Sequence, residues 1–260
     1  MVLTGEINYV IIIDGIRVGS SVCLIARTIY FVIGWAWVPY ESSQYWTELL
    51  KDIPAPTYVV CDGQKGMLHA IGSIWPNTTV QRCRFHAWSN IRTKLTMHPE
   101  SEAGKQLLDI GLTLLNVHSK HEVRRWKHSL QTWYHKHQGY IDQRTISPSP
   151  KPGQRKWHYT HDRVRSAYRQ LHKITDDLLR SSYRPHPELP RNTNYVEGGI
   201  NSQLRTKLKD HRGMSFEHQT VLVERYLYSR SEAAETKPYP EYSLAKTTPI
   251  YDQKPPRKTF

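Results

Sequence analysis

Dense apolar runs separated by polar residues characterise the first forty residues of the chain. The runs at 7–13, 20–26 and 29–38 are rich in Ile, Val, Tyr and Trp, which favour β-strands. The second and third runs meet at Arg27 and Thr28. A membrane-spanning helix would have to bury that arginine, whereas a hairpin can turn there, so this stretch predicts two strands and no membrane segment.

Helical and extended patterns alternate over the next forty residues. Residues 41–53 open with serines of the capping type and place apolar side chains on one side, which predicts a helix. Residues 57–61 predict a strand, 66–75 a helix and 78–83 a short strand. Three strands followed by helix, strand, helix and strand is the order of an α/β fold with an RNase H-like mixed sheet.

The pattern changes to a helical one after about residue 87. Apolar residues within 107–115, 126–133 and 167–178 indicate three buried helices, and the Pro, Ser and Gly content of 145–156 predicts a loop. We therefore expect an all-helical insertion that interrupts the RNase H-like core.

Four segments are predicted along the chain. The C-terminal core segment should contain helices at about 193–208 and 215–230, and the polar, proline-containing end has no apolar period and predicts disorder. The expected division is 1–86 for the first part of the core, 87–190 for the insertion, 191–231 for the C-terminal core helices and 232–260 for the tail.

Charge and cysteine content narrow the class of partner. The chain has 36 Lys and Arg against 23 Asp and Glu, a formal net charge of +13. This surplus favours a polyanionic partner such as nucleic acid, although charge alone also fits a merely basic protein. Cys23, Cys61 and Cys83 lie in or beside apolar runs, which suits reduced thiols in the cytoplasm. No secretory signal pattern opens the sequence.

Two carboxylates stand at the ends of predicted strands. Asp14 and Asp62 each follow an apolar run and precede a glycine. If the strands are parallel neighbours, the two acids meet at one end of the sheet, where like charges are unfavourable unless protonated or bridged by cations. Oxygen ligands suit Mg²⁺ or Mn²⁺, and two such ions about 3.5–4 Å apart support phosphoryl transfer. The alternative is two ordinary Asp-Gly turns.

A third acid is offered by the predicted helix at 193–208. Asn194, Glu197, Asn201 and Arg205 follow at intervals of three and four, so they share one helix face. The alternative is a solvated face with a basic end. The Gly-Gly pair after Glu197 argues against that alternative, because a helix formed only for stability would avoid two glycines.

Four sequence blocks together resemble a known family. They are Asp-Gly at 14–15, VVCDGQKG at 59–66, WPNTTVQRCRFH at 75–86 and NTNYVEGGIN at 192–201 with a later HRGM. In this order they resemble DDE transposases of bacterial insertion sequences in the Mutator-like superfamily, over about residues 5–230. The resemblance implies an RNase H-like core with a helical insertion. It also implies catalysis by Asp14, Asp62 and Glu197, which would hold two Mg²⁺ or Mn²⁺ ions.

Cys83 and His86 match a Cys-x-x-His element of that family. Four ligands are normal for structural zinc, and the sequence has no second cysteine pair, so zinc is not expected. We expect His86 to contact phosphate or orient a carboxylate near the active site, and Cys83 to lie in the core. Asn194 and Asn201 are the expected accessory residues beside Glu197.

The segment Trp157 to Arg163 also resembles a part of these transposases. An aromatic side chain beside an unstacked base, with Arg163 on a phosphate, would suit strand opening, and His161 belongs to the same segment. The alternative is that Trp157 is a core residue of the helical insertion. The cations expected to follow the DNA backbone are Arg82, Arg84, Arg205, Lys207, Lys209 and Arg212.

The resemblance implies a DNA transposase catalytic domain that hydrolyses a phosphodiester and then joins the freed 3′-hydroxyl to target DNA. The implied partners are transposon ends, target DNA and a second copy of the chain, in the bacterial cytoplasm at the nucleoid. Full-length relatives carry a DNA-binding region before the first catalytic strand, and no such pattern precedes Asp14. The alternatives are a catalytically silent DNA-binding remnant and an RNase H-like nuclease without strand transfer.

Overall fold

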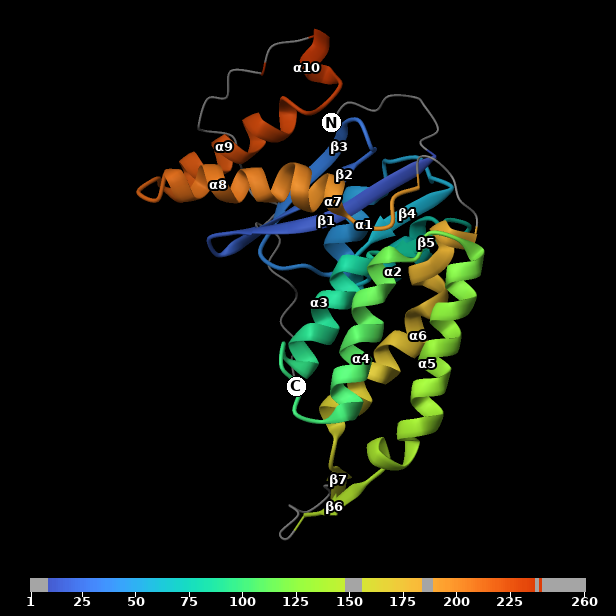
Figure 1. Cartoon of the computed structure of the whole chain (residues 1–260). Helices are drawn as coiled ribbons and strands as arrows, with labels where there is room; N and C mark the ends of the chain where they lie inside the picture. Colours follow the sequence, from blue (N-terminus) through green and yellow to red (C-terminus); the bar gives the residue numbers. More distant parts are fainter. Residues whose placement is uncertain (1–8, 148–155, 184–188, 237–238, 240–260) are drawn as a thin grey trace, which may run out of the picture. The chain divides into compact units, whose positions relative to one another are not determined.

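The computed structural model describes residues 9–147, 156–183, 189–236 and 239 (Figure 1). The chain forms two compact units, residues 1–80 with 193–260 and residues 81–192. Within the described ranges, every helix is too short or too polar to cross a membrane.

The first unit is built on a mixed sheet of five strands. The strands are β1 (Val10–Val18), β2 (Ser21–Arg27), β3 (Val32–Val38), β4 (Tyr58–Cys61) and β5 (Thr79–Arg82). Their order is β3-β2-β1-β4-β5, with β1–β2 and β2–β3 antiparallel and β1–β4 parallel. This sheet confirms the predicted α/β class and its mixed sheet.

Two helices cover one face of this sheet, α1 (Ser43–Leu50) and α2 (Lys65–Ile74). Alternate residues of the strands, such as Ile11 and Ile13, join Trp46 of α1 and others in one hydrophobic cluster. Because successive side chains of a strand point to opposite faces of the sheet, every second residue packs against these helices. Ser42 caps α1, because its side chain accepts a hydrogen bond from the Tyr45 backbone N–H.

The C-terminal helices belong to the same unit and contact its strands. They are α7 (Asn194–Val196), a π-helical turn (Glu197–Asn201), α8 (Ser202–Asp210), α9 (Phe216–Tyr228) and α10 (Ala233–Thr236). Helix α7 contacts β1 and α9 contacts β3. Trp37 of β3 donates from Nε1 to Glu224 Oε1 of α9 at 3.1 Å.

The second unit is mainly helical. Its elements are α3 (Arg84–Leu95), α4 (Glu102–Thr113), a 3₁₀ turn (Leu114–Asn116), α5 (Lys120–Ile141), β6 (Arg144–Ile146), β7 (Trp157–Tyr159) and α6 (Asp162–Tyr183). Its core contains Trp88, Leu107, Trp126 and Leu171, one from each helix. Strands β6 and β7 form an antiparallel hairpin where α5 ends and α6 begins (Figure 1).

Several predicted features need correction. The insertion is not all-helical, because β6 and β7 pair within it, and the predicted loop at 145–156 begins inside β6. The compact unit spans 81–192, against the predicted 87–190. Of the predicted disordered tail, residues 233–236 form α10, and nearly all the rest lies outside the described residues.

Candidate active site

Asp14 lies inside β1, not at its end, so the predicted strand end at residue 13 was wrong. Pairing with β2 carries the strand to Val18. The carboxylate is 7% exposed. Its Oδ1 accepts from the Gly15 N–H at 3.0 Å, and its Oδ2 accepts from Asn201 Nδ2 at 3.3 Å. These donors offset part of the cost of burying a charge in the middle of a sheet.

Asp62 directly follows β4. The parallel pairing of Ile12 with Val60, continued by two residues, brings Asp62 level with Asp14 on the sheet. Asp62 Oδ1 accepts from the Gln64 N–H at 2.9 Å, just before α2 begins. Gly63 between them has a φ of 79°, a left-handed conformation that glycine adopts readily. The fold therefore aligns the two predicted acids from separate strands.

Asn201 connects the C-terminal helices to Asp14. It is 1% exposed, and its amide nitrogen must face Asp14 because an ionised carboxylate only accepts hydrogen bonds. In the described part of the chain, its Oδ1 has no hydrogen-bond partner. A buried acceptor without a donor costs about 1–3 kcal/mol, which a cation bound beside Asp14 would relieve. Carboxylate and amide oxygens are the ligands that Mg²⁺ and Mn²⁺ prefer, so this donor set fits the expected ions.

Glu197 begins the π-helical turn, so the helix predicted at 193–208 is present from Asn194 to Asp210 but is not a regular α-helix throughout. The wider turn also breaks the predicted shared face, because Asn194 is exposed whereas Asn201 is buried. Gly198 and Gly199 occupy this turn, and such turns are frequent at functional sites. The Glu197 side chain lies outside the described residues, and its role as the third acid stays a prediction.

Arg27 holds the chain next to Glu197. Its side chain is 8% exposed, and Nη1 donates to the Tyr195 carbonyl at 2.7 Å, while Nε donates to the Thr28 carbonyl at 2.7 Å. Burial, and then the charge of Arg230, lower the pKa of Arg27. A single arginine therefore ties the β2–β3 turn to the segment that carries the predicted third acid. Sequence reasoning used Arg27 only to exclude a membrane span.

Glu41 is a carboxylate that the sequence analysis missed. It precedes α1 and is half-buried. Burial raises the pKa of Glu41, and the negative charge of Asp62 raises it further. Gln64 and Arg17 lower that pKa, as does the nearby Trp46 indole. The indole Nε1 has no hydrogen-bond partner at standard geometry among the described residues, so its effect is that of a nearby dipole.

The described side chains do not form a closed metal site. No three His, Cys, Asp or Glu side chains among them are grouped as ligands for one ion. The Glu197 side chain is outside that set. The two acids and the unsatisfied Asn201 oxygen would supply only part of a ligand set for the expected ions.

Arg84 corrects a prediction about DNA contacts. It is 1% exposed, and Nε donates to the Leu178 carbonyl at 2.8 Å while Nη2 donates to Ser182 Oγ at 2.7 Å. Its Nη1 also donates to the Val117 carbonyl. Burial, and then the charge of Arg191, lower its pKa. A guanidinium enclosed in this way ties α3 to α6 and cannot contact DNA.

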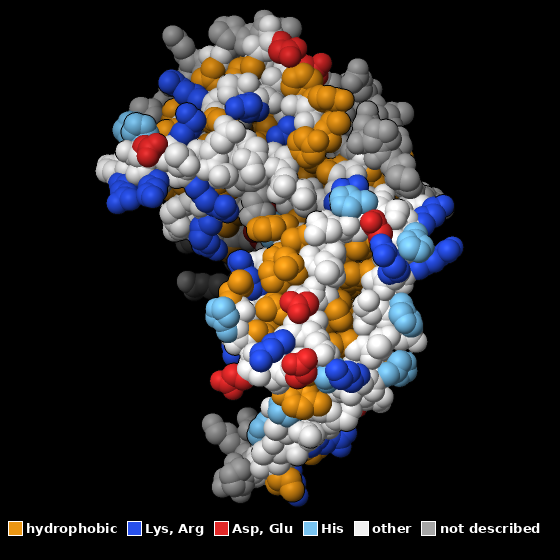
Figure 2. Space-filling model, in the orientation of Figure 1, with side chains coloured by type: hydrophobic (Ala, Val, Ile, Leu, Met, Phe, Trp, Pro, Cys, Tyr) orange, Lys and Arg blue, Asp and Glu red, His pale blue; other side chains and the backbone are white. Residues whose placement is uncertain are grey.

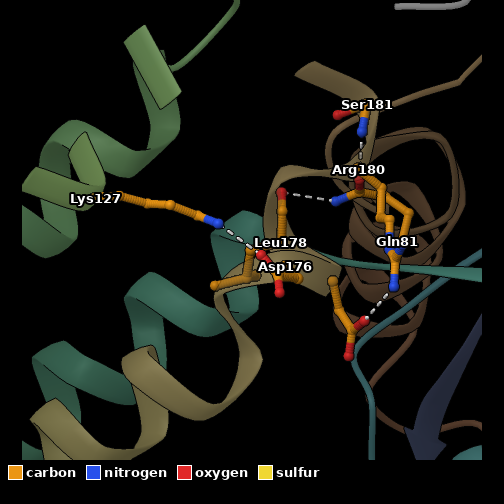
Figure 3. A network of polar contacts seen from close by, with 7 residues as sticks. Gln81, Lys127, Asp176, Leu178, Arg180 and Ser181 are labelled. Atoms are coloured by element: carbon orange, nitrogen blue, oxygen red, sulfur yellow. Dashed lines mark hydrogen bonds and ion pairs between the residues drawn. The ribbon is translucent and has the colours of Figure 1, made fainter. Parts of the chain in front are cut away.

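The neighbouring Gln81 makes a similar internal connection (Figure 3). Its Nε2 donates to the Leu178 carbonyl at 3.0 Å, and its Oε1 accepts from the Ser181 N–H at 2.9 Å. Arg82, between these two residues, is half-buried. The polar residues on either side of Arg82 therefore hold the second unit together.

Cys83 caps α3 in the second unit. It is fully buried, and its sulfur accepts from the His86 backbone N–H at 3.5 Å. The Cys-x-x-His spacing thus produces a helix cap at this position. His86 is half-buried in the first turn of α3, and its predicted contact with phosphate stays a prediction.

The β6–β7 hairpin presents aromatic and cationic side chains. Trp157 is absent from the buried helical core, so its alternative role as a core residue is wrong. The Arg144 guanidinium lies 4.1 Å from the Trp157 ring centroid. His161 stacks on Tyr140 at 3.6 Å and pairs with Gln143 at 2.9 Å, and burial lowers its pKa. Arg163 is exposed in the first turn of α6.

Exposed cations follow α8. Figure 2 shows Lys and Arg side chains gathered near the far end of that helix. Four predicted DNA contacts on α8 or just after it are exposed: Arg205, Lys207, Lys209 and Arg212. Arg163 is exposed as well, so exposure separates these cations from the enclosed Arg84 and the half-buried Arg82.

A groove between α5 and α6 was not predicted. The rings of Tyr134 and Tyr168 stack in it at 4.9 Å, and Arg165, Arg169 and His172 also line it. Asp142 and Asp176 line it too, so the charges of the groove are mixed. The spacing of these residues along two separate helices gave no recognisable pattern.

Comparison with known proteins defines the class. Residues 3–144 match the family described as "Transposase, Mutator family". The match covers more than half of the chain and includes Asp14, Glu41 and Asp62, and it ends before Glu197. This chain therefore belongs to the Mutator family of transposases.

One curated relative aligns with a shorter stretch. Over 70 residues the chain is 34% identical to the "Transposase for insertion sequence element IS6120" of Mycolicibacterium smegmatis. The aligned stretch covers 24% of this chain and 22% of that relative. The relationship supports the predicted resemblance to bacterial insertion-sequence transposases.

Proposed function

We propose that this chain carries the catalytic core of a DNA transposase with an RNase H-like sheet. The proposed reaction is metal-dependent hydrolysis of a phosphodiester at the element end, followed by attack of the freed 3′-hydroxyl on target DNA. The observation that carries the proposal is that Asp14 on β1 and Asp62, directly after the parallel strand β4, are level in the strand register of a Mutator-family chain. Transposon ends, target DNA and a second copy of the chain are the proposed partners.

Asp14, Asp62 and Glu197 are the proposed acids of the site. Two Mg²⁺ or Mn²⁺ ions, when bound, would activate the attacking oxygen and stabilise the leaving oxygen. Asn201 donates a hydrogen bond from its amide nitrogen to the Asp14 carboxylate, and its own side-chain oxygen would be a further ligand. Arg27 fixes the backbone next to Glu197 through the Tyr195 carbonyl.

The exposed cations of α8 are proposed to bind the DNA backbone. Phosphate contacts of this kind position DNA without reading its sequence, and their strength falls with added salt. Arg205→Ala should therefore weaken DNA retention similarly for unrelated sequences. The same substitution should leave the fold unchanged, because Arg205 is exposed.

Joining of a pre-cleaved end tests the proposed reaction directly. An oligonucleotide with a free 3′-hydroxyl, a plasmid target and Mn²⁺ remove the need for end recognition by the protein. We expect joined product from the unaltered chain and none from Asp62→Asn or Glu197→Gln. Glu48→Gln is the matched control, because Glu48 is exposed on α1 and pairs with Lys51.

The other outcomes assign a different function. Nicked plasmid without joined product would indicate a nuclease without strand transfer. If the unaltered chain and Glu197→Gln neither nick nor join DNA, yet both retain it in a salt-sensitive manner, the enzyme proposal is wrong. The chain would then be a DNA-binding protein that uses the exposed cations of α8.

A further inference from the structure

Glu41 lies against the strand that carries Asp14. A Cβ placed on Gly15 would lie 2.8 Å from Glu41 Oε1 and 3.1 Å from its Cδ. Heavy atoms in ordinary contact are about 3.5–4.0 Å apart, so a side chain at residue 15 would displace the Glu41 carboxylate from this position. Gly15 is the residue directly after Asp14. The glycine of the first Asp-Gly pair thus makes room for the Glu41 carboxylate.

The backbone next to Glu41 is also fixed by close contact. A Cβ on Gly66 of α2 would lie 3.0 Å from the Ser43 nitrogen and 3.3 Å from the Ser42 carbonyl carbon. The first turn of α2 therefore packs directly on the start of α1. Because Asp62 lies just before α2, this contact holds the segments that carry Glu41 and Asp62 together.

The charges around Glu41 leave its carboxylate unbalanced. Among the described residues, no Lys, Arg or His forms an ion pair with it. Its electrostatic neighbours are the Asp62 carboxylate, which disfavours its charge, and Arg17, which favours it weakly. Two like charges beside each other in a partly buried place are unfavourable unless one is protonated or a cation bridges them, so a bound cation would favour the charged form of both.

Two buried polar atoms lie beside these acids without a partner in the described residues. The Trp46 side chain is 0% exposed, and its Nε1 is near the Glu41 carboxylate. The Asn201 side chain is 1% exposed, and its Oδ1 has no donor although its amide group is bonded to Asp14. The indole N–H is only a donor and can serve the Glu41 carboxylate. The buried Asn201 oxygen is an acceptor without a donor, which is rare and indicates an absent cation.

We propose that Glu41 is a further ligand-supplying carboxylate of the divalent-cation site formed by Asp14 and Asp62. The inference rests on the proposed function and adds to it an acid from the β3–α1 connection. Binding requires a rotation of the Glu41 or Asp62 side chain, since no three described acids are grouped as ligands before the cation arrives. Rotation about side-chain bonds needs no movement of the strands.

Binding of Mn²⁺ alone to the full chain tests the inference without relying on activity. Free Mn²⁺ is measured by electron paramagnetic resonance during titration of the unaltered protein, Glu41→Gln, Asp62→Asn and Glu48→Gln. Loss of a supporting carboxylate should weaken cation affinity about 10- to 100-fold. We expect this loss for Glu41→Gln, a loss at least as large for Asp62→Asn, and unchanged affinity for Glu48→Gln.

Glu41→Asp and thermal unfolding keep a folding defect separate from a binding defect. The aspartate retains the charge on a shorter side chain, so its affinity should fall between those of the unaltered protein and Glu41→Gln. Without metal, Glu41→Gln should unfold at the same temperature as the unaltered protein or a higher one, because a carboxylate near Asp62 has been removed. A cooperative transition shows that the variant is folded.

The outcomes distinguish the inference from the proposed function. If Glu41→Gln binds Mn²⁺ like the unaltered protein while Asp62→Asn does not, the cation site stands and Glu41 is not part of it. If the unaltered protein binds no Mn²⁺, the proposed metal site and the inference are both wrong. If Glu48→Gln weakens Mn²⁺ binding as much as Glu41→Gln, the loss of affinity comes from the change in the net charge of the protein. The inference about Glu41 then fails.

Discussion

The two Asp-Gly pairs of this chain have the same sequence and different structures. Gly15 lies within β1, and its missing side chain is the space that Glu41 occupies. Gly63 lies in the connection after β4, and its φ of 79° is the reason for glycine there. One glycine serves packing and the other serves backbone conformation. The dipeptide pattern alone therefore does not reveal whether a turn follows the aspartate.

The carboxylates of the two pairs differ in the same way. Asp14 is 7% exposed and is held by Asn201 from the C-terminal helices. Asp62 is half-buried and accepts from a backbone N–H two residues later. One acid thus depends on long-range packing and the other on local chain geometry. Substitutions at the two glycines should show whether each position depends on long-range packing or on local backbone conformation.

Gly15→Ala should have the largest effect. Its methyl group would lie 2.8 Å from Glu41 Oε1 and 3.3 Å from Val22 Cγ1, in the middle of the sheet. Overpacking of this kind costs about 1–3 kcal/mol. We expect that loss in the free energy of unfolding by urea, together with weaker Mn²⁺ binding, because the Glu41 carboxylate must move.

A double-mutant cycle with Glu41→Ala identifies the cause of that loss. Removing the Glu41 carboxylate gives the new methyl group space, so Gly15→Ala should cost less in the Glu41→Ala background. Coupling of about 0.5–3 kcal/mol is typical for residues in contact. Additive effects would show that Val22, not Glu41, restricts this position.

Gly63→Ala should cost less than Gly15→Ala, and for a different reason. An alanine at positive φ costs about 1–2 kcal/mol, and asparagine tolerates that conformation better. We expect Gly63→Asn to recover part of the stability that Gly63→Ala loses in urea unfolding. Glu41→Ala should not rescue Gly63→Ala, and rescue would contradict the distinction between the two glycines.

The sequence predicted the sheet well because strand periodicity and turn residues are local. It misplaced the end of β1, because pairing with β2 and the packing of Glu41 on Gly15 are long-range contacts. The π-helical turn at Glu197 was missed for a related reason. Intervals of three and four assume a regular α-helix, and a wider turn shifts every later side chain.

Charge was the least reliable guide to the site. Arg84 and Arg205 are equivalent in a count of cations, yet one is enclosed between α3 and α6 and the other is exposed. Glu41 carried no pattern of its own, since its importance comes from Gly15 and Asp62 on other segments. Burial and neighbours decide the role of a charged residue, and neither is written in its local sequence.

Asn201→Ala should affect the surroundings of Asp14 and leave those of Asp62 unchanged. The change removes the hydrogen bond to Asp14 Oδ2 and also the unsatisfied Oδ1, so its two effects on stability partly cancel. We expect a net loss of about 1 kcal/mol in unfolding free energy, with weaker Mn²⁺ binding. Asn90→Ala, at an exposed position on α3, is the matched control. Equal losses in both variants would mean that Asn201 has no special link to Asp14.

The smallest of the expected effects is a change in the pH dependence of stability, which arises from the interaction between Glu41 and Asp62. Burial, and then the charge of Asp62, raise the pKa of Glu41 above its ordinary value of 4.5. Above that value the unfolded chain has released a proton that the folded chain still holds, so stability falls as pH rises through the interval up to the raised pKa. In metal-free buffer, the unfolding temperature of the unaltered protein should therefore fall with pH relative to that of Glu41→Gln.

Added Mn²⁺ should reverse this fall, because the cation favours the charged carboxylates in the folded state. Parallel curves for the two proteins in metal-free buffer would mean that Glu41 is too well solvated to respond to Asp62. The space beside Gly15 would then be a packing feature of the sheet, without electrostatic consequence for the aligned acids.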